Sequence, residues 1–172
     1  MNETNPPLEI ERKFLIARPS ETLLLAKCRE RREIRQAYLT SGGHGENRRV
    51  REAVTNGTAR YFYTEKQRIT AVTRIERERE ITREEFERLY AEREEGLRVI
   101  EKVRYVVPYE GHALEIDLFP FWTDRAFCEC ELRSETETLA LPDWLHVRRE
   151  VTDDPRYTNH ALAREIPQDI LS

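Results

Sequence analysis

Long apolar runs are missing from this sequence. The first residues, MNETNPPLE, include no hydrophobic stretch of the kind found in a secretion signal. No later segment approaches the about 20 apolar residues that a membrane-spanning helix requires. We therefore expect no membrane partner.

Cysteine and histidine are scarce. The three cysteines, Cys28, Cys128 and Cys130, are an odd number and lack the spacing of a disulfide framework. A reducing cytoplasm is the expected location, because thiols stay free there. The four histidines lie far apart, and none stands at zinc-ligand spacing with a cysteine, so we expect no structural zinc site.

No charge of one sign dominates either. The 33 acidic residues nearly balance the 29 basic residues, and the net charge is −4. A nucleic-acid duplex is therefore not an expected partner, because binding one usually requires a basic stripe.

The low hydrophobicity has two explanations. Hydrophobic residues make up 38% of the chain and charged residues 36%, which suits either a disordered chain or a folded domain with charge both outside and inside. An aromatic content of 9% and the small net charge favour the folded domain. The length predicts a single domain, residues 1–172, with residues 1–7 as a flexible tail.

Local patterns predict about eight strands, at residues 8–16, 36–40, 47–53, 59–66, 73–81, 98–108, 113–119 and 127–133. Glycines at positions 42, 43 and 45 predict a flexible loop, and Asn56-Gly57 predicts a hairpin turn. Three helices are expected: residues 20–32, a helix capped by Thr82 and Glu85 that stops near Gly96, and a short helix after Pro155. Short turns between the strands favour an antiparallel sheet, open or closed.

Three strands present pairs of carboxylates. Residues i and i+2 of a strand share one face, so Glu9, Glu11 and Lys13 lie together, with Leu8 and Ile10 on the other face. Two further strands repeat this spacing, with the pairs Glu115 and Asp117, and Glu129 and Glu131.

Basic side chains occur at the same spacing in other strands. The sets are Arg49 with Arg51, Thr64 with Lys66, and Lys102 with Arg104. The strand at 73–81 places four charged residues on one face: Arg74, Glu76, Glu78 and Glu80. The repeated Glu-Arg run also permits a shifted register there, so the roles of its three glutamates are left open.

An ordinary antiparallel sheet with one wet face also alternates polar and apolar residues. Here, however, the polar positions are almost all ionised, and acids stand beside acids. Two carboxylates about 4 Å apart repel by several kcal/mol at an effective dielectric constant near 20. A divalent cation relieves that repulsion, and oxygen ligands suit Mg²⁺ or Mn²⁺. Carboxylates, a metal and basic residues together are the equipment of phosphoryl transfer.

These motifs resemble, in order, those of the CYTH, or triphosphate tunnel metalloenzyme, superfamily, from residue 9 to about residue 167. Glu9-Ile10-Glu11-Arg12-Lys13 resembles the ExExK motif of that superfamily. The following segments are similar to its later elements: Arg49-Val50-Arg51, Thr64-Glu65-Lys66, Arg74-Ile75-Glu76-Arg77-Glu78, Glu101-Lys102-Val103-Arg104-Tyr105, Glu115-Ile116-Asp117-Leu118-Phe119, Glu129-Cys130-Glu131, and residues 150–159. Glu65 and Arg77 depart from the pattern, which predicts an unusually wet barrel exterior.

The resemblance implies an α+β fold, a closed antiparallel barrel of about eight strands with helices packed outside. The charged face would line a tunnel, and Ile10, Ile116 and Leu118 would pack outward. It also implies hydrolysis of a triphosphate, with inorganic tripolyphosphate common among short bacterial members, and one or two Mg²⁺ or Mn²⁺ ions.

Roles for individual residues follow from the resemblance. The expected phosphate-binding residues are Lys13, Arg49, Arg51, Lys66, Arg74, Lys102 and Arg104. The expected metal ligands are Glu9, Glu11, Glu129 and Glu131, with Glu115 and Asp117 as further ligands or water-orienting groups. The expected catalytic set is Glu9, Glu11, Lys13, Asp117, Glu129 and Glu131. Tyr157 is expected either to close one mouth of the tunnel or simply to pack.

Other functions remain open at the level of the sequence. A class IV adenylate cyclase uses the same tunnel but needs a pocket for the base, which the sequence does not identify. Thiamine triphosphatases and RNA triphosphatases belong to the same superfamily. A non-catalytic module that binds polyphosphate or a nucleotide would not require so many carboxylates. The sequence also leaves a homodimer open.

Overall fold

The computed structural model describes residues 7–40 and 46–171. Nearly all of the expected flexible tail, residues 1–6, and the expected loop with glycines at 42, 43 and 45 lie outside these ranges. No helix in the described ranges is long and apolar enough to cross a membrane.

Nine strands form one antiparallel sheet. They are β1 (Leu8–Ala17), β2 (Glu30–Leu39), β3 (Glu46–Thr55), β4 (Thr58–Arg68), β5 (Thr73–Ile81), β6 (Ile100–Tyr109), β7 (His112–Leu118), β8 (Arg125–Leu132) and β9 (Val147–Glu150). The helices are α1 (Glu21–Lys27), α2 (Arg83–Ala91), a 3-10 turn η1 (Pro155–Tyr157) and α3 (Asn159–Arg164).

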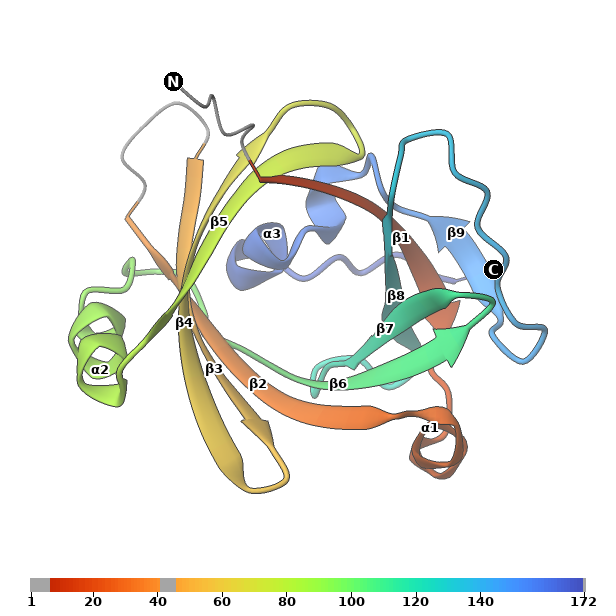
Figure 1. Cartoon of the computed structure of the whole chain (residues 1–172), viewed down its shortest axis with the longest axis horizontal. Coiled ribbons are helices and arrows are strands. Elements are labelled where there is room, and N and C mark those ends of the chain that lie inside the picture. The colour runs from red at the N-terminus through yellow and green to blue at the C-terminus, as the bar shows by residue number, and fades with distance from the viewer. Residues whose placement is uncertain (1–6, 41–45, 172) are drawn as a thin grey trace.

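The sheet closes into a barrel, as Figure 1 shows from one end. The strand order is β5-β4-β3-β2-β6-β7-β8-β1, and β1 then pairs with β5 through residues 8–10. The other half of β1 turns away from β5 and pairs with β9, which lies outside the ring. The structure therefore confirms an eight-stranded closed barrel and adds a ninth strand that was not predicted.

Two hairpin turns fix the register of adjacent strands. Asn56 and Gly57 have φ angles of 50° and 76°, and Glu110 and Gly111 have φ angles of 47° and 77°. A two-residue loop with both φ angles positive matches the right-handed twist of the flanking strands. The predicted turn at Asn56-Gly57 is confirmed.

The first helix is shorter than predicted. The prediction of a helix over residues 20–32 was wrong beyond Lys27, because Cys28 has an extended backbone and β2 begins at Glu30. The second helix was predicted well at its start: the Thr82 hydroxyl accepts a hydrogen bond from the backbone N–H of Glu85 at 3.1 Å. It ends at Ala91, before the predicted stop near Gly96.

The apolar side chains form three clusters. One lies outside the barrel under α1 and contains Ile116 and Leu118, with Ile10 against it, as predicted. A second lies outside under α2 and includes Phe86 and Leu89. Burial of each such side chain stabilises the fold by about 1.5–3 kcal/mol.

The third cluster closes one end of the barrel. Leu15 and Phe127 continue the inward-facing rows of Lys13 and Glu129, and they meet Tyr157 of η1 and Leu162 of α3. Figure 1 shows α3 within the outline of the ring, whereas α1 and α2 lie outside it. The interior is therefore apolar at the α3 end and charged beyond it.

Candidate functional site

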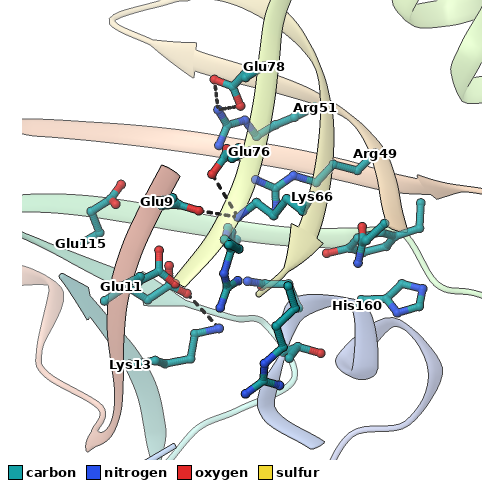
Figure 2. Close-up of a pocket in the computed structure, with 18 of the residues that line it drawn as sticks. Glu9, Glu11, Lys13, Arg49, Arg51, Lys66, Glu76, Glu78, Glu115 and His160 are labelled. Atoms are coloured by element: carbon teal, nitrogen blue, oxygen red, sulfur yellow. Dashed lines mark hydrogen bonds and ion pairs between the residues drawn. The ribbon is translucent and has the colours of Figure 1, made fainter. Parts of the chain in front are cut away.

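A cavity of about 310 Å³ occupies the charged part of the barrel. Figure 2 shows acidic and basic side chains from different strands pointing into it. Its lining includes these predicted site residues: Glu9, Glu11, Lys13, Arg49, Arg51, Lys66, Arg74, Lys102, Arg104, Glu115 and Glu129. Glu76 and Glu78, whose roles the sequence left open, also line it.

Strand register places acids beside bases in this lining. Directly opposed residues on neighbouring strands point to the same side of the sheet. Glu9 stands opposite Arg74, Lys66 opposite Glu76, and Lys13 opposite Glu129. A shift by one residue in any of these strands would turn its charged row to the outside.

Most of the charges are paired with each other. Lys66 lies 3.3 Å from Glu9 and 3.5 Å from Glu76. Lys13 lies 3.1 Å from Glu129. Burial by itself would raise the pKa of Glu129. The charges of Lys13 and Arg104 instead hold the pKa of this carboxyl well below its usual range.

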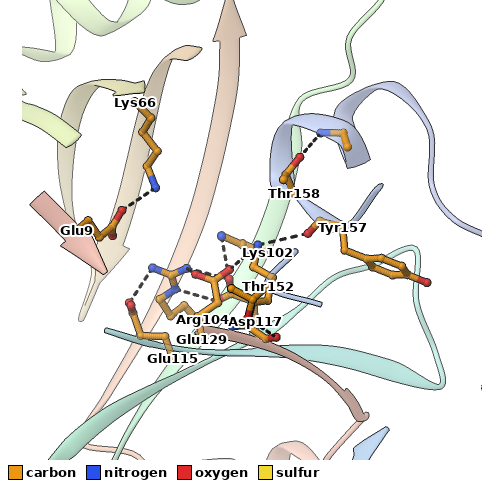
Figure 3. Close-up of polar contacts among 12 residues, drawn as sticks. Glu9, Lys66, Lys102, Arg104, Glu115, Asp117, Glu129, Thr152, Tyr157 and Thr158 are labelled. Atoms are coloured by element: carbon orange, nitrogen blue, oxygen red, sulfur yellow. Dashed lines mark hydrogen bonds and ion pairs between the residues drawn. The ribbon is translucent and has the colours of Figure 1, made fainter. Parts of the chain in front are cut away.

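Asp117 faces the barrel interior from β7, beneath the side chains of Lys102 and Arg104, and has no exposed surface (Figure 3). Its carboxylate accepts hydrogen bonds from Lys102 at 2.8 Å and from Arg104 at 2.7 and 2.8 Å. Arg104 also donates to Glu115 at 2.7 Å. Against the effect of burial, the two cations lower the pKa of Asp117. Both carboxylate oxygens of Asp117 are thus occupied in orienting Lys102 and Arg104.

Glu11 is a buried carboxylate with no cation within 4 Å in the described ranges, although the charges of Lys66 and Lys13 act on it from farther away. Its exposed fraction is 7%, and within residues 7–40 and 46–171 its side chain makes no hydrogen bond or ion pair. Burial, followed by the charge of Glu129, raises the pKa of Glu11 to about 7. Burial and the neighbouring Glu76 likewise raise the pKa of Glu9 to about 7.

The cavity also holds bases without carboxylate partners. Arg49 is 8% exposed and, like Arg74, has no carboxylate within 4 Å in the described part of the chain. The Nε atoms of Arg49, Arg51 and Arg74 are buried without a hydrogen-bond partner. Burial and the charge of Arg49 lower the pKa of Arg51 to about 10. An anion in the cavity would satisfy these donors.

No three acidic, histidine or cysteine side chains within the described ranges converge into a ready-made metal cage. The donor chemistry nevertheless fits a divalent cation. Glu11 supplies carboxylate oxygens that form no ion pair in the described ranges, and the charges of Glu129 and Glu9 raise its pKa. A hard cation prefers such carboxylate oxygens.

Two predicted metal ligands are placed differently from the others. Glu131 stands opposite Glu11 in the β1–β8 pair, but it is exposed and lines an adjoining shallow cavity with Glu9 and Glu76. Asp117 contacts two cations and does not reach the cavity surface. Glu80 lies beyond the rim, paired with Arg60 at 2.7 Å.

Several lining residues were not predicted: Arg32, Tyr38, Asn47, Arg68, Thr152, Thr158, Asn159 and His160. Arg32 was missed because its segment was predicted to be helical, although the alternation from Glu30 to Leu39 fits a strand. Tyr38 and Asn47 lie in the predicted strands at 36–40 and 47–53, and residue parity could have identified their inward positions. Asn159 and His160 belong to α3, and Thr152 and Thr158 to the chain before it, whose position depends on tertiary packing.

Tyr157 packs at one end of the barrel, and closure of a tunnel mouth by this residue stays a prediction. Its ring is buried in the cluster that closes the barrel end. Its backbone carbonyl accepts a hydrogen bond from the Lys13 ammonium at 3.3 Å. Beside it, His160 packs edge-on against Tyr38 with ring centroids 4.8 Å apart.

Comparisons with known proteins agree with this geometry. No family model matches the sequence. An inorganic triphosphatase of Nitrosomonas europaea is 37% identical over 164 residues, which cover 92% of this chain and 99% of the relative. An inorganic triphosphatase of Acetivibrio thermocellus is 32% identical over 157 residues, covering 91% and 93%.

Solved structures share the fold. The crystal structure of an inorganic triphosphatase matches with a TM-score of 0.57 and 34% identity, over 92% of this chain and 96% of that one. A Pyrococcus horikoshii protein matches with a TM-score of 0.54 and 22% identity, over 74% and 80%. The second likeness concerns the fold alone. The two sequence relatives, each matched along nearly its full length, show that the chain belongs to the inorganic triphosphatase family, within the CYTH, or triphosphate tunnel metalloenzyme, superfamily.

Proposed function

We propose that this chain hydrolyses the terminal phosphoanhydride of inorganic tripolyphosphate and releases orthophosphate, with Mg²⁺ or Mn²⁺ as cofactor. The two relatives named inorganic triphosphatase support the reaction. The observation that carries the proposal is a pair of unmatched buried charges in one cavity, Glu11 and Arg49. Leaving an ion buried without a partner is costly, so the cavity is built for a cation and an anion together.

Arg49 and Arg74 are the first phosphate-binding residues in this proposal, because they have no carboxylate to release. Guanidinium groups bind phosphate oxygens through two parallel hydrogen bonds. Lys13, Lys66 and Arg51 each contact a glutamate, and each would exchange that partner for a phosphate oxygen.

Lys102 and Arg104 act from a fixed position. Asp117 holds both of them through three hydrogen bonds. A preorganised cation stabilises developing negative charge without having to reorient during the reaction. We therefore assign Asp117 a positioning role.

Glu9, Glu11 and Glu129 are the residues that would hold the cation, with Glu131 and Glu115 near enough to assist at the rim. A bound divalent cation withdraws charge from phosphate oxygens and lowers the pKa of a bound water. A cation beside Glu11 would lower the pKa of this carboxyl and keep it ionised at neutral pH.

Phosphate release from tripolyphosphate with Mg²⁺ or Mn²⁺ tests the proposal. The variant Glu11→Gln should lower kcat/KM by about 100-fold or more, since it removes a buried charge next to the reacting groups. Glu101→Gln, on the outer face of β6, is the matched control and should match the wild type. Full activity of Glu11→Gln, or wild-type activity that persists in EDTA, would exclude the metal assignment.

Parallel incubations separate the alternative substrates. Release of cyclic AMP and pyrophosphate from ATP would indicate a cyclase, whereas faster turnover of thiamine triphosphate would indicate a thiamine triphosphatase. Binding of tripolyphosphate without turnover at saturating metal would indicate a non-catalytic module.

The cysteines bear on location. Cys28, Cys128 and Cys130 are free thiols, and the last two are buried. Free thiols are common in reducing compartments, and we place the protein in the cytoplasm on this basis.

A further inference from the structure

Two adjacent arginines of β2 point to opposite sides of the barrel wall. Arg32 lines the cavity, whereas Arg31 lies on the outer face, where it contacts Tyr105 and Glu33. Each arginine is paired with a glutamate two residues away: Arg32 with Glu30 at 2.5 Å, and Arg31 with Glu33 at 3.0 Å. The strand thus carries one inward pair and one outward pair of the same composition.

Arg32 lies toward the end of the cavity that is remote from α3. Tyr38, on the same strand, contacts His160 of α3. Six residues separate Arg32 from Tyr38, which is roughly 20 Å along an extended strand. The backbone of Arg32 is therefore far from that of the unpaired Arg49, which stands opposite Tyr38 in the β2–β3 pair, but the two long side chains line the same cavity.

The neighbour of Arg32 across the β2–β6 pair is Arg104. Arg104 is buried, and Asp117 and Glu115 accept hydrogen bonds from its three guanidinium nitrogens. The side chain of Arg32, in contrast, is 32% exposed, and within residues 7–40 and 46–171 it donates a hydrogen bond only from Nη2, to Glu30. As far as the described residues show, Arg32 thus has guanidinium donors without a partner and room to move.

We propose that Arg32 is a further substrate-binding residue. It gives up its ion pair with Glu30 and binds the phosphate that lies farthest from α3. The inference rests on the proposed function, because it takes a triphosphate as the occupant of the cavity. Glu30 competes with the substrate for Arg32 and so weakens binding in the wild type. Arg32 discriminates a triphosphate from orthophosphate, which is too short to reach from Arg49 to this position.

Calorimetric binding of tripolyphosphate in EDTA tests the inference without hydrolysis. Arg32→Met should weaken binding about tenfold, the loss of one charge-assisted hydrogen bond. Glu30→Gln should have the opposite effect and tighten binding severalfold. Orthophosphate should bind Arg32→Met and the wild type equally.

Arg31→Met and Glu33→Gln are the matched controls, because they remove the same charges from the outer face. Both should bind tripolyphosphate as the wild type does. If Glu30→Gln weakens binding as Arg32→Met does, the pair is merely structural and the inference is wrong. Unchanged binding by Arg32→Met would overturn it as well.

Two further measurements keep the outcomes separate. Thermal melting shows whether each variant is folded. If Arg32→Met does not fold, Arg32→Lys, which keeps the charge, takes its place. Arg32→Lys should bind tripolyphosphate with an affinity between those of the wild type and Arg32→Met. A wild type that binds tripolyphosphate without hydrolysing it contradicts the proposed function but leaves the test of Arg32 valid.

Discussion

At the residue scale, the barrel interior contains two kinds of buried charge. Asp117 belongs to the first kind, because both of its carboxylate oxygens accept hydrogen bonds from Lys102 and Arg104 within the protein. Glu11 and Arg49 belong to the second kind, because neither has a partner of opposite charge in the structure as described here. The first kind stabilises geometry, and the second kind favours binding of ions from solution.

Asp117→Asn tests the first kind. The substitution leaves Lys102 and Arg104 buried with a neutral amide, so the free energy of unfolding should fall by about 3–5 kcal/mol. Urea denaturation with and without Mg²⁺ measures this loss. Glu80→Gln, which breaks an exposed pair with Arg60 at the rim, should leave the urea midpoint unchanged. A midpoint of Asp117→Asn equal to that of the wild type would contradict the positioning role.

Most of the cavity lining could be predicted from residue parity in the strands. Glu9, Arg51, Lys66 and Glu129 were assigned to one face each, and they meet in one cavity. The state of each charge could not be predicted in this way. Whether a carboxylate is paired, as Glu129 is with Lys13, or unpaired, as Glu11 is, depends on which strand lies opposite and at what register.

At the element scale, the errors have identifiable causes. Leu23, Leu24 and Ala26 gave the segment from residue 20 a helical pattern, and it was extended too far, over the first residues of β2. The short β9 carries three charged residues of four and has no alternation of its own. Its place beside β1 depends on long-range contacts, including a two-bond ion pair between Arg12 and Glu150 at 2.8 and 2.9 Å.

The packing of α3 also depends on distant partners. A helix of six residues is not stable alone in water, and α3 is held by the contacts of Leu162 and Ala163 with the apolar end of the barrel. As a consequence, the end of the barrel interior next to α3 is apolar and does not bind phosphate.

Leu162→Ala tests whether α3 belongs to the cooperative core. Leu162 is fully buried, so the variant should lose about 2–5 kcal/mol of stability by creating a cavity. Leu25→Ala in α1 removes a leucine that is 57% exposed, and it should change stability by less than about 0.5 kcal/mol. Chemical denaturation compares the two, and equal losses would show that α3 is only loosely attached.

At the scale of the whole molecule, the net charge of −4 is small, but many acidic and basic side chains are concentrated inside the barrel. Glu9 and Glu11 have folded-state pKa values of about 7, above the usual value of 4.5. Their contribution to stability is therefore fully present below about pH 4.5, and it is lost as the pH rises toward and through 7. His160 has the opposite dependence, because burial lowers its pKa.

The comparison of wild type with Glu11→Gln isolates the carboxylate effect from that of His160. In EDTA, the melting temperature of the wild type should fall relative to that of Glu11→Gln between pH 5 and pH 8. Mg²⁺ or Mn²⁺ at pH 8 should raise the melting temperature of the wild type more than that of the variant, because a ligand of the folded state stabilises it. A difference between the two proteins that does not vary with pH would refute the assignment of the raised pKa.

The sequence by itself determined most of the strands and their charged faces, because side-chain parity in a strand is a local property of the backbone, but it determined neither β9 nor the start of β2. It also determined the family through the order and spacing of its motifs. Only the tertiary structure decided that β1 pairs with both β5 and β9, that Lys102 and Arg104 cover Asp117, and that Arg32 faces inward. These features depend on the closure of the barrel, which brings residues far apart in the chain within reach of each other's charge.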